Sequence, residues 1–197
     1  MADCKIRSFN AKRAMVFLWK LTLIGWVILR RSKPHIHNEF QFSERYNNVS
    51  VSATLADGAN SVRLKFNGYS HKAERWDTNV VPMTDEQEDL AWKEACRLAG
   101  LPIDWLTLDK LCQGEKYYAG KTAVKYDKVG QICHILPWTV WKPSKGKTWC
   151  TKTVNLVTCA GRPDWERFLR EHPKIKFNEL MPDQLHYMSE YYFRKVA

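Results

Sequence analysis

The stretch His35-Ile36-His37-Asn38-Glu39-Phe40-Gln41-Phe42 decides the fold, because most of its side chains alternate with the period of a β-strand. The alternation predicts one face with His37, Glu39 and Gln41 and an opposite face with Ile36, Asn38, Phe40 and Phe42. Four further segments have strand character, and they are residues 4–8, 49–55, 61–66 and 75–81, the last closed by Pro82. Short connections between successive strands predict an antiparallel sheet or meander.

Helical patterns occupy most of the remaining chain outside 114–148. An apolar helix is predicted over 12–31, and Thr84 with Gln87 three residues later forms a capping box that opens a helix ending near Gly100. Further helices are predicted over 150–160, ended by Gly161, over 164–171, and from Pro182 onward. The chain of 197 residues is therefore predicted to be a single α+β domain, 1–197, with an antiparallel sheet packed against helices.

The candidate chemistry combines a thiol with an imidazole. Cys150 begins the predicted helix 150–160, where the positive end of the helix dipole is expected to lower the pKa of a thiol. A thiol nucleophile needs an imidazole within hydrogen-bond reach and a third polar group that orients it. His37 is the candidate base, and Glu39 on the same strand face is the candidate third group, with Ser52 as the alternative. The backbone N–H of Cys150 would contribute to an oxyanion site.

Several segments, in order, resemble the circularly permuted papain-fold, NlpC-like cysteine hydrolases of bacteria and phages. The segment 34–42 resembles the family's His-x-Glu strand, with matches at His37, Glu39 and Phe42. The remaining resemblances are Gly58 through Lys65, Trp76-Asp77, the helix from Thr84, the turn Gly100 through Trp105, Trp149-Cys150-Thr151 and Met181 through Leu185.

The resemblance implies a permuted papain-like fold in which the His strand precedes the Cys helix. It implies a thiol-dependent hydrolase or acyltransferase acting on an amide, often in a peptidoglycan peptide. Carried over position by position, Cys150 is the nucleophile, His37 the base and Glu39 the acidic member of the His-x-Glu pair. Residues 115–148 lengthen the segment before the nucleophile and are interpreted as a basic insertion.

The net charge of +10 is concentrated in two blocks. Residues 1–34 hold eight Lys and Arg with one acid, and residues 116–152 hold eight Lys with one acid. Such blocks favour anionic partners, so a nucleic-acid-binding module and a non-catalytic virion or docking protein remain alternatives to the hydrolase. Interleaved aromatic and Lys residues within 115–148 suit base stacking and phosphate contacts.

The six cysteines form no CxxC pair, which indicates reduced thiols in a reducing, cytoplasmic compartment, with virion association as a further expectation. Cys96 and Cys159 are interpreted as packing residues. His35-x-His37 with Cys133-His134 supplies ligand types suited to a metal but fits no common spacing, so neither a metal nor a cofactor is predicted.

The apolar run 14–29 contains Lys20 and is shorter than the roughly 20 residues of a spanning helix. We interpret it as a core helix, with membrane contact as the alternative. The sequence Arg30-Arg31-Ser32-Lys33-Pro34 that follows is unlike the small-residue cleavage site of a signal peptide, and no cleavable signal is predicted.

Overall fold

The computed structural model describes residues 2–12, 32, 34–54, 61–65, 73–99, 150–172 and 180–196. Within these residues it is an α+β fold with a five-stranded antiparallel sheet and four α-helices. The strands are β1 (Ala2–Asn10), β2 (His35–Gln41), β3 (Ser50–Thr54), β4 (Ser61–Lys65) and β5 (Trp76–Met83). The helices are α2 (Asp85–Leu98), α5 (Cys150–Gly161), α6 (Pro163–Arg170) and α7 (Pro182–Val196), and two short 3₁₀ turns are η2 (Glu44–Tyr46) and η4 (Ala73–Arg75).

The strand order is β4-β3-β2-β1-β5, so the first four strands form a meander and β5 is added beside β1. This arrangement confirms the predicted antiparallel meander. The prediction that Pro82 closes the fifth strand is wrong, because Pro82 lies inside β5 and pairs with Asp3. Among the strands that the structure describes, β5 pairs only with β1, so it is an edge strand there, where a residue without an N–H is tolerated.

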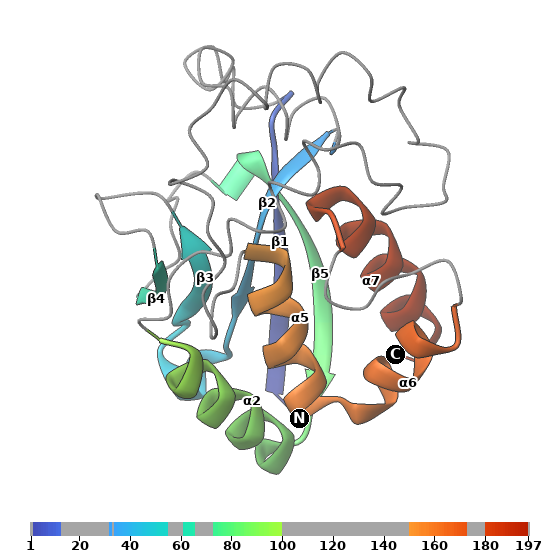
Figure 1. The fold of residues 1–197 in the computed structure, drawn as a ribbon. Coiled ribbons are helices and arrows are strands. Elements are labelled where there is room, and N and C mark those ends of the chain that lie inside the picture. The colour runs from blue at the N-terminus through green and yellow to red at the C-terminus, as the bar shows by residue number, and fades with distance from the viewer. Residues whose placement is uncertain are drawn as a thin grey trace, which may run out of the picture.

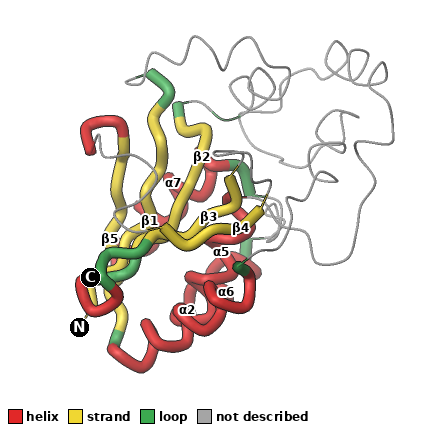
Figure 2. The backbone as a smooth tube through the Cα atoms, turned by 90° about the vertical axis from the view of Figure 1, so that its left-hand side faces the viewer, coloured by secondary structure: helices red, strands yellow, loops and turns green. Residues whose placement is uncertain are grey.

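The helices α5 and α7 lie across one face of the sheet, as Figure 1 shows. The helix α5 contacts β2 and β3, whereas α7 contacts β1, β2 and β5. The helix α2 packs along α5, and Figure 2 shows α2, α5 and α6 gathered beside the strands. One apolar core fills the space between the sheet and the helices, with Ile6, Phe40, Val157, Trp165 and Leu185 fully buried in it.

The helix boundaries follow from local signals in the sequence. The predicted capping box is confirmed, since Thr84 accepts from the backbone N–H of Gln87 while the Gln87 side chain accepts from the backbone N–H of Thr84. Pro163 and Pro182 stand in the first turns of α6 and α7, where their missing N–H costs nothing. Gly161 is the last residue of α5 rather than the residue after its end.

Candidate functional site

Cys150 is the first residue of α5, and the residue as a whole is half-buried. The Sγ atom lies 3.8 Å from the hydroxyl of Thr151 and accepts a hydrogen bond from the backbone N–H of Asn38 in β2. The pairing of β2 with β3 covers Phe40 and Gln41 but stops before Asn38. The start of α5 therefore meets β2 where β3 leaves it, and the thiol takes a strand N–H that no β3 carbonyl uses.

Ser52 occupies the same gap between the two strands. Its hydroxyl donates to the carbonyl oxygen of Asn38 at 2.6 Å. The N–H and C=O of one strand residue point to the same side of the strand. Cys150 and Ser52 thus complete the hydrogen bonding of Asn38 together, and the hydroxyl of Ser52, the alternative third group, is held by the backbone.

His37 directly precedes Asn38, so the candidate base and the backbone group that contacts the thiol are neighbours in the chain. The strand alternation directs the His37 side chain to the face with Phe9 and Trp76. The ring centroids of His37 and Trp76 are 6.2 Å apart in an edge-on arrangement. Burial lowers the pKa of His37 from 6.5 to about 4, because the charged imidazolium loses its hydration there.

The structure corrects the expectation of a lowered pKa for Cys150. Burial raises the pKa of this thiol, and the hydrogen bonds from the Asn38 backbone and from Thr151 oppose that shift without reversing it. Desolvation of a thiolate outweighs the favourable N–H groups at the helix start in this position. Both shifts have the same consequence, since the resting state of Cys150 is a neutral thiol and that of His37 is a neutral imidazole.

Glu39 lies on the same sheet face as His37 and is fully buried. Its Oε1 accepts from Arg7 of β1 at 2.9 Å and from the hydroxyl of Ser50 at 3.4 Å. The Arg7 guanidinium also lies 4.7 Å from the ring centroid of Trp76. Glu39 is therefore one partner of a buried ion pair that joins β1 to β2 on the sheet face that carries His37.

Asn38 is a site residue that sequence reasoning treated only as part of the apolar face. Its side chain accepts from the Thr151 hydroxyl at 3.0 Å and donates to the Ser8 hydroxyl at 2.8 Å and to the Pro182 carbonyl at 3.3 Å. These contacts fix the start of α5 and the start of α7 against β2. The signal in the sequence is an amide at a position where the alternation calls for an apolar side chain.

A β-bulge changes the face on which His35 lies. The register between β1 and β2 pairs Phe9 with His37 and Asn10 with His35, which leaves Ile36 as the extra residue. His35 consequently points toward α7, on the face opposite His37. His35 and His37 therefore do not share one face of the strand.

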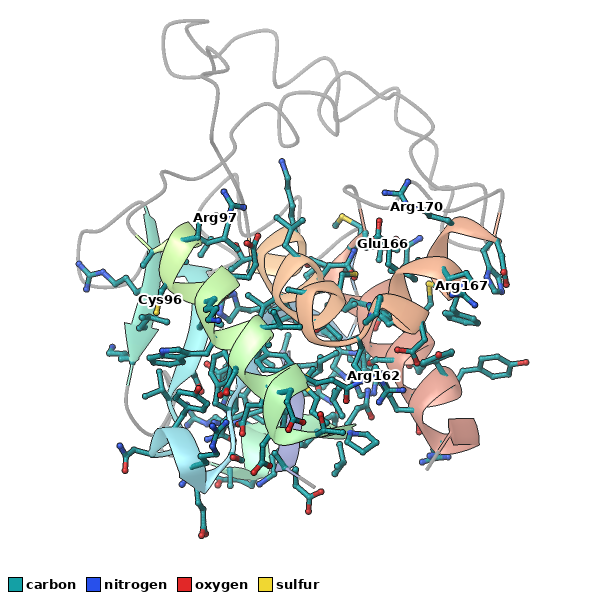
Figure 3. All side chains as sticks on the ribbon, turned by 90° about the horizontal axis from the view of Figure 1, so that it is seen from below. Cys96, Arg97, Arg162, Glu166, Arg167 and Arg170 are labelled. Atoms are coloured by element: carbon teal, nitrogen blue, oxygen red, sulfur yellow. The ribbon has the colours of Figure 1, made fainter. Side chains whose placement is uncertain are left out.

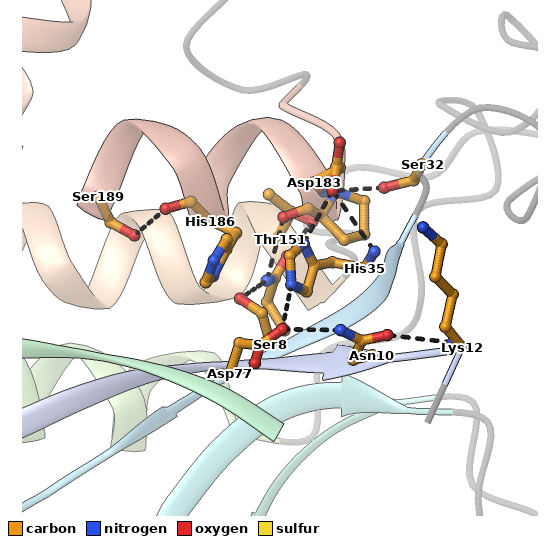
Figure 4. A network of polar contacts seen from close by, with 12 residues as sticks. Ser8, Asn10, Lys12, Ser32, His35, Asp77, Thr151, Asp183, His186 and Ser189 are labelled. Atoms are coloured by element: carbon orange, nitrogen blue, oxygen red, sulfur yellow. Dashed lines mark hydrogen bonds and ion pairs between the residues drawn. The ribbon is translucent and has the colours of Figure 1, made fainter. Parts of the chain in front are cut away.

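His35 is instead the centre of a polar cluster that sequence reasoning missed, shown in Figure 4. Its Nδ1 lies 2.8 Å from Asp183 of α7, and its Nε2 lies 2.8 Å from Asp77 of β5. The His186 ring packs on the His35 ring with centroids 3.9 Å apart. Among the described residues, His35, Asp77 and His186 offer ligand atoms within 4.8 Å of one another, as a metal ion requires.

Of the two remaining cysteine predictions, the structure confirms one and contradicts the other. Cys159 is buried in the core, as predicted, whereas Cys96 is exposed on α2, and Figure 3 shows it on the side of α2 away from α5. The prediction that Cys96 is a packing residue is wrong, because the helix stripe that faces the core runs through Ala91, Ala95 and Leu98.

The predicted basic insertion 115–148 and the apolar run 14–29 lie outside the described residues, as do Cys112, Cys133 and His134. Within the residues that the structure describes, every helix is too short or too polar to cross a bilayer. Comparisons of the chain with protein-family models, with curated proteins and with solved structures gave no match.

Proposed function

We propose that this protein is a thiol-dependent hydrolase or acyltransferase that cleaves an amide bond, with Cys150 as nucleophile. The proposal includes a permuted papain-like arrangement, in which the His strand precedes the Cys helix. The observation that carries it is the position of Cys150 as the first residue of α5, where the Thr151 hydroxyl donates to the Asn38 side chain at 3.0 Å and fixes the helix start against β2.

The resting protonation states define how the reaction begins. Because burial favours the neutral thiol, the proton of Cys150 passes to a base as the thiol attacks the amide carbonyl. The carbonyl carbon then bonds to Sγ, the amine leaves with the proton returned by that base, and water or another acceptor releases the acyl group. His37, the base expected from the sequence, projects from the opposite face of the sheet, so its imidazole lies away from the helix that carries Cys150.

Glu39 has a positioning role in this proposal, through its pair with Arg7. The pair holds β2 against β1 on the face that carries His37, and so fixes the backbone from which the imidazole projects. Cell-wall peptide amides are the proposed substrate class, since the ordered sequence motifs resemble those of peptidoglycan hydrolases.

The test is an acyl-transfer assay on the full chain with peptidoglycan fragments and peptide amides as substrates, followed by peptide mapping of acyl adducts. We expect the adduct on Cys150, abolished in Cys150→Ala and retained in Cys96→Ala, whose thiol is the more exposed of the two. Folded His37→Ala should keep turnover, as should His172→Ala at an exposed position after α6, because the His37 imidazole lies on the sheet face opposite α5.

Circular dichroism and thermal unfolding establish that each variant remains folded. Turnover that persists in folded Cys150→Ala, or acylation that follows exposure and appears on Cys96, would refute the assignment of the nucleophile. A loss of about 10²–10⁴-fold in folded His37→Ala alone would show that His37 acts as the base, contrary to its place on the opposite face of the sheet.

A further inference from the structure

Four polar side chains from β2, β5 and α7 meet beside the first turn of α7 (Figure 4). His35 lies between two carboxylates, with Nδ1 2.8 Å from Asp183 Oδ1 and Nε2 2.8 Å from Asp77 Oδ2. His186 packs on the His35 ring, with centroids 3.9 Å apart and planes tilted by 35°. The two histidines are 2% and 7% exposed, so the cluster is closed on its imidazole side.

The charges within this cluster do not balance. Two carboxylates bring two negative charges, and both nitrogens of His35 face carboxylate oxygens, so the ring contributes at most one positive charge as an imidazolium. The charges of these four side chains therefore sum to a negative value in a largely buried place, which favours a nearby cation. A divalent cation together with neutral imidazoles brings this sum to zero.

The arrangement also has the two layers of a metal site. Histidine ligands commonly donate their second ring nitrogen to a carboxylate, which orients the ring and raises the basicity of the ligating nitrogen. Asp183 stands at Nδ1 of His35 in this way. Asn10 donates to Asp77 at 2.8 Å and holds that carboxylate in place.

We propose that His35, Asp77 and His186 bind a divalent transition-metal ion, with Zn²⁺ the best match, and that Asp183 orients His35 as an outer partner. Two imidazole nitrogens and one carboxylate oxygen are a ligand set that zinc uses with a fourth position left to water. The metal would join β2, β5 and the start of α7, three elements that are distant in sequence.

The spacing of the three ligand atoms is close to the spacing that a zinc site requires. Zinc bonds of about 2.0–2.1 Å in a tetrahedron set the ligand atoms about 3.3 Å apart. His35 Nε2 and Asp77 Oδ2 are 2.8 Å apart, and all three ligand atoms lie within 4.8 Å of one another.

This inference does not depend on the proposed hydrolase, and its test uses the full chain without substrate. The protein is stripped with EDTA and titrated with Zn²⁺ by calorimetry, then with Co²⁺ by visible absorption, whose intensity reports tetrahedral coordination. We expect one equivalent of metal in the wild type and its loss in both His186→Ala and Asp77→Asn. Asp183→Asn should keep the equivalent but bind it about 10–100-fold more weakly.

His172→Gln is the matched control, because this exposed histidine lies after α6 and should leave the equivalent intact. Asp77→Asn keeps the size of the side chain, so the proposal remains testable if His186→Ala fails to fold. Binding that is absent in the wild type, or an equivalent that survives both ligand variants, would show that the cluster is an ion-pair network only and would overturn the proposal.

Discussion

At the scale of single residues, the buried ion pair between Glu39 and Arg7 bears most directly on stability. Their side chains are 0% and 9% exposed and 2.9 Å apart. A buried pair of this kind contributes little net stability over apolar residues, but removal of one partner leaves an uncompensated buried charge. The pair therefore makes position 39 sensitive to loss of charge, whatever the part that Glu39 has in catalysis.

We expect Glu39→Gln to lower the free energy of unfolding by about 3–5 kcal/mol, because Arg7 loses its counter-charge while the shape is kept. Urea denaturation measures the change. Glu166→Gln is the control, since Glu166 pairs with Arg170 at an exposed place on α6 and should cost less than about 1 kcal/mol. Similar losses in the two variants would contradict the buried pair.

The thiol of Cys150 provides a second prediction at this scale. Because burial raises its pKa, alkylation by iodoacetamide should have a pH midpoint above the ordinary value of ~8.5. At pH 7.5 Cys150 should consequently label more slowly than exposed Cys96, as peptide mapping by mass spectrometry would report. A midpoint below the ordinary value would mean that Cys150 is a thiolate at rest, which would contradict the raised pKa of this thiol.

At the scale of elements, the packing of α5 against α2 depends on Gly161. A Cβ atom at this position would lie 2.7 Å from the backbone carbonyl oxygen of Gln87 and 2.9 Å from Met83. The Met83 side chain can move, but the Gln87 carbonyl belongs to α2 and moves only with the helix. The close approach of the two helices thus requires glycine, and it sets where α5 ends relative to the sheet.

We expect Gly161→Ala to destabilise the protein by about 1–2 kcal/mol, because overpacking costs about 1–3 kcal/mol and exceeds the gain in helix propensity of about 1 kcal/mol. Thermal unfolding gives the sign directly. A higher melting temperature would show that α2 and α5 separate without cost, and that their contact is looser than the structure has it.

At the scale of the whole molecule, the net charge of +10 gives a sequence pI near 9.3. A surplus of this size attracts polyanions without regard to sequence. We expect binding to duplex DNA or heparin that weakens at least tenfold between 50 and 200 mM salt, measured by fluorescence anisotropy. Cys150→Ala should leave this binding unchanged, since the substitution removes no positive charge.

The Cys150→Ala variant also distinguishes a hydrolase from a nucleic-acid-binding or docking protein. Salt-dependent binding that survives Cys150→Ala, in a protein that shows no acyl transfer, would favour a nucleic-acid-binding or docking role over the hydrolase. Binding that is indifferent to salt would contradict the electrostatic prediction itself.

Much of the fold was determined by the sequence alone, because its signals are local. The period-two alternation located the five strands within a few residues, and the capping box at Thr84 located the start of α2. Cys150 was placed at a helix start from the same local pattern. Hydrogen bonding between near neighbours and the direction of successive side chains decide all of these features.

Only the tertiary structure decided how the sites are arranged. The bulge at Ile36 depends on the register of β2 against β1, and this register sends His35 to one face of the sheet and His37 to the other. The partners of His35 come from β5 and α7, and the raised pKa of Cys150 results from burial of its thiol at the start of α5. Register, burial and charge balance arise from contacts between distant segments, and no local pattern carries them.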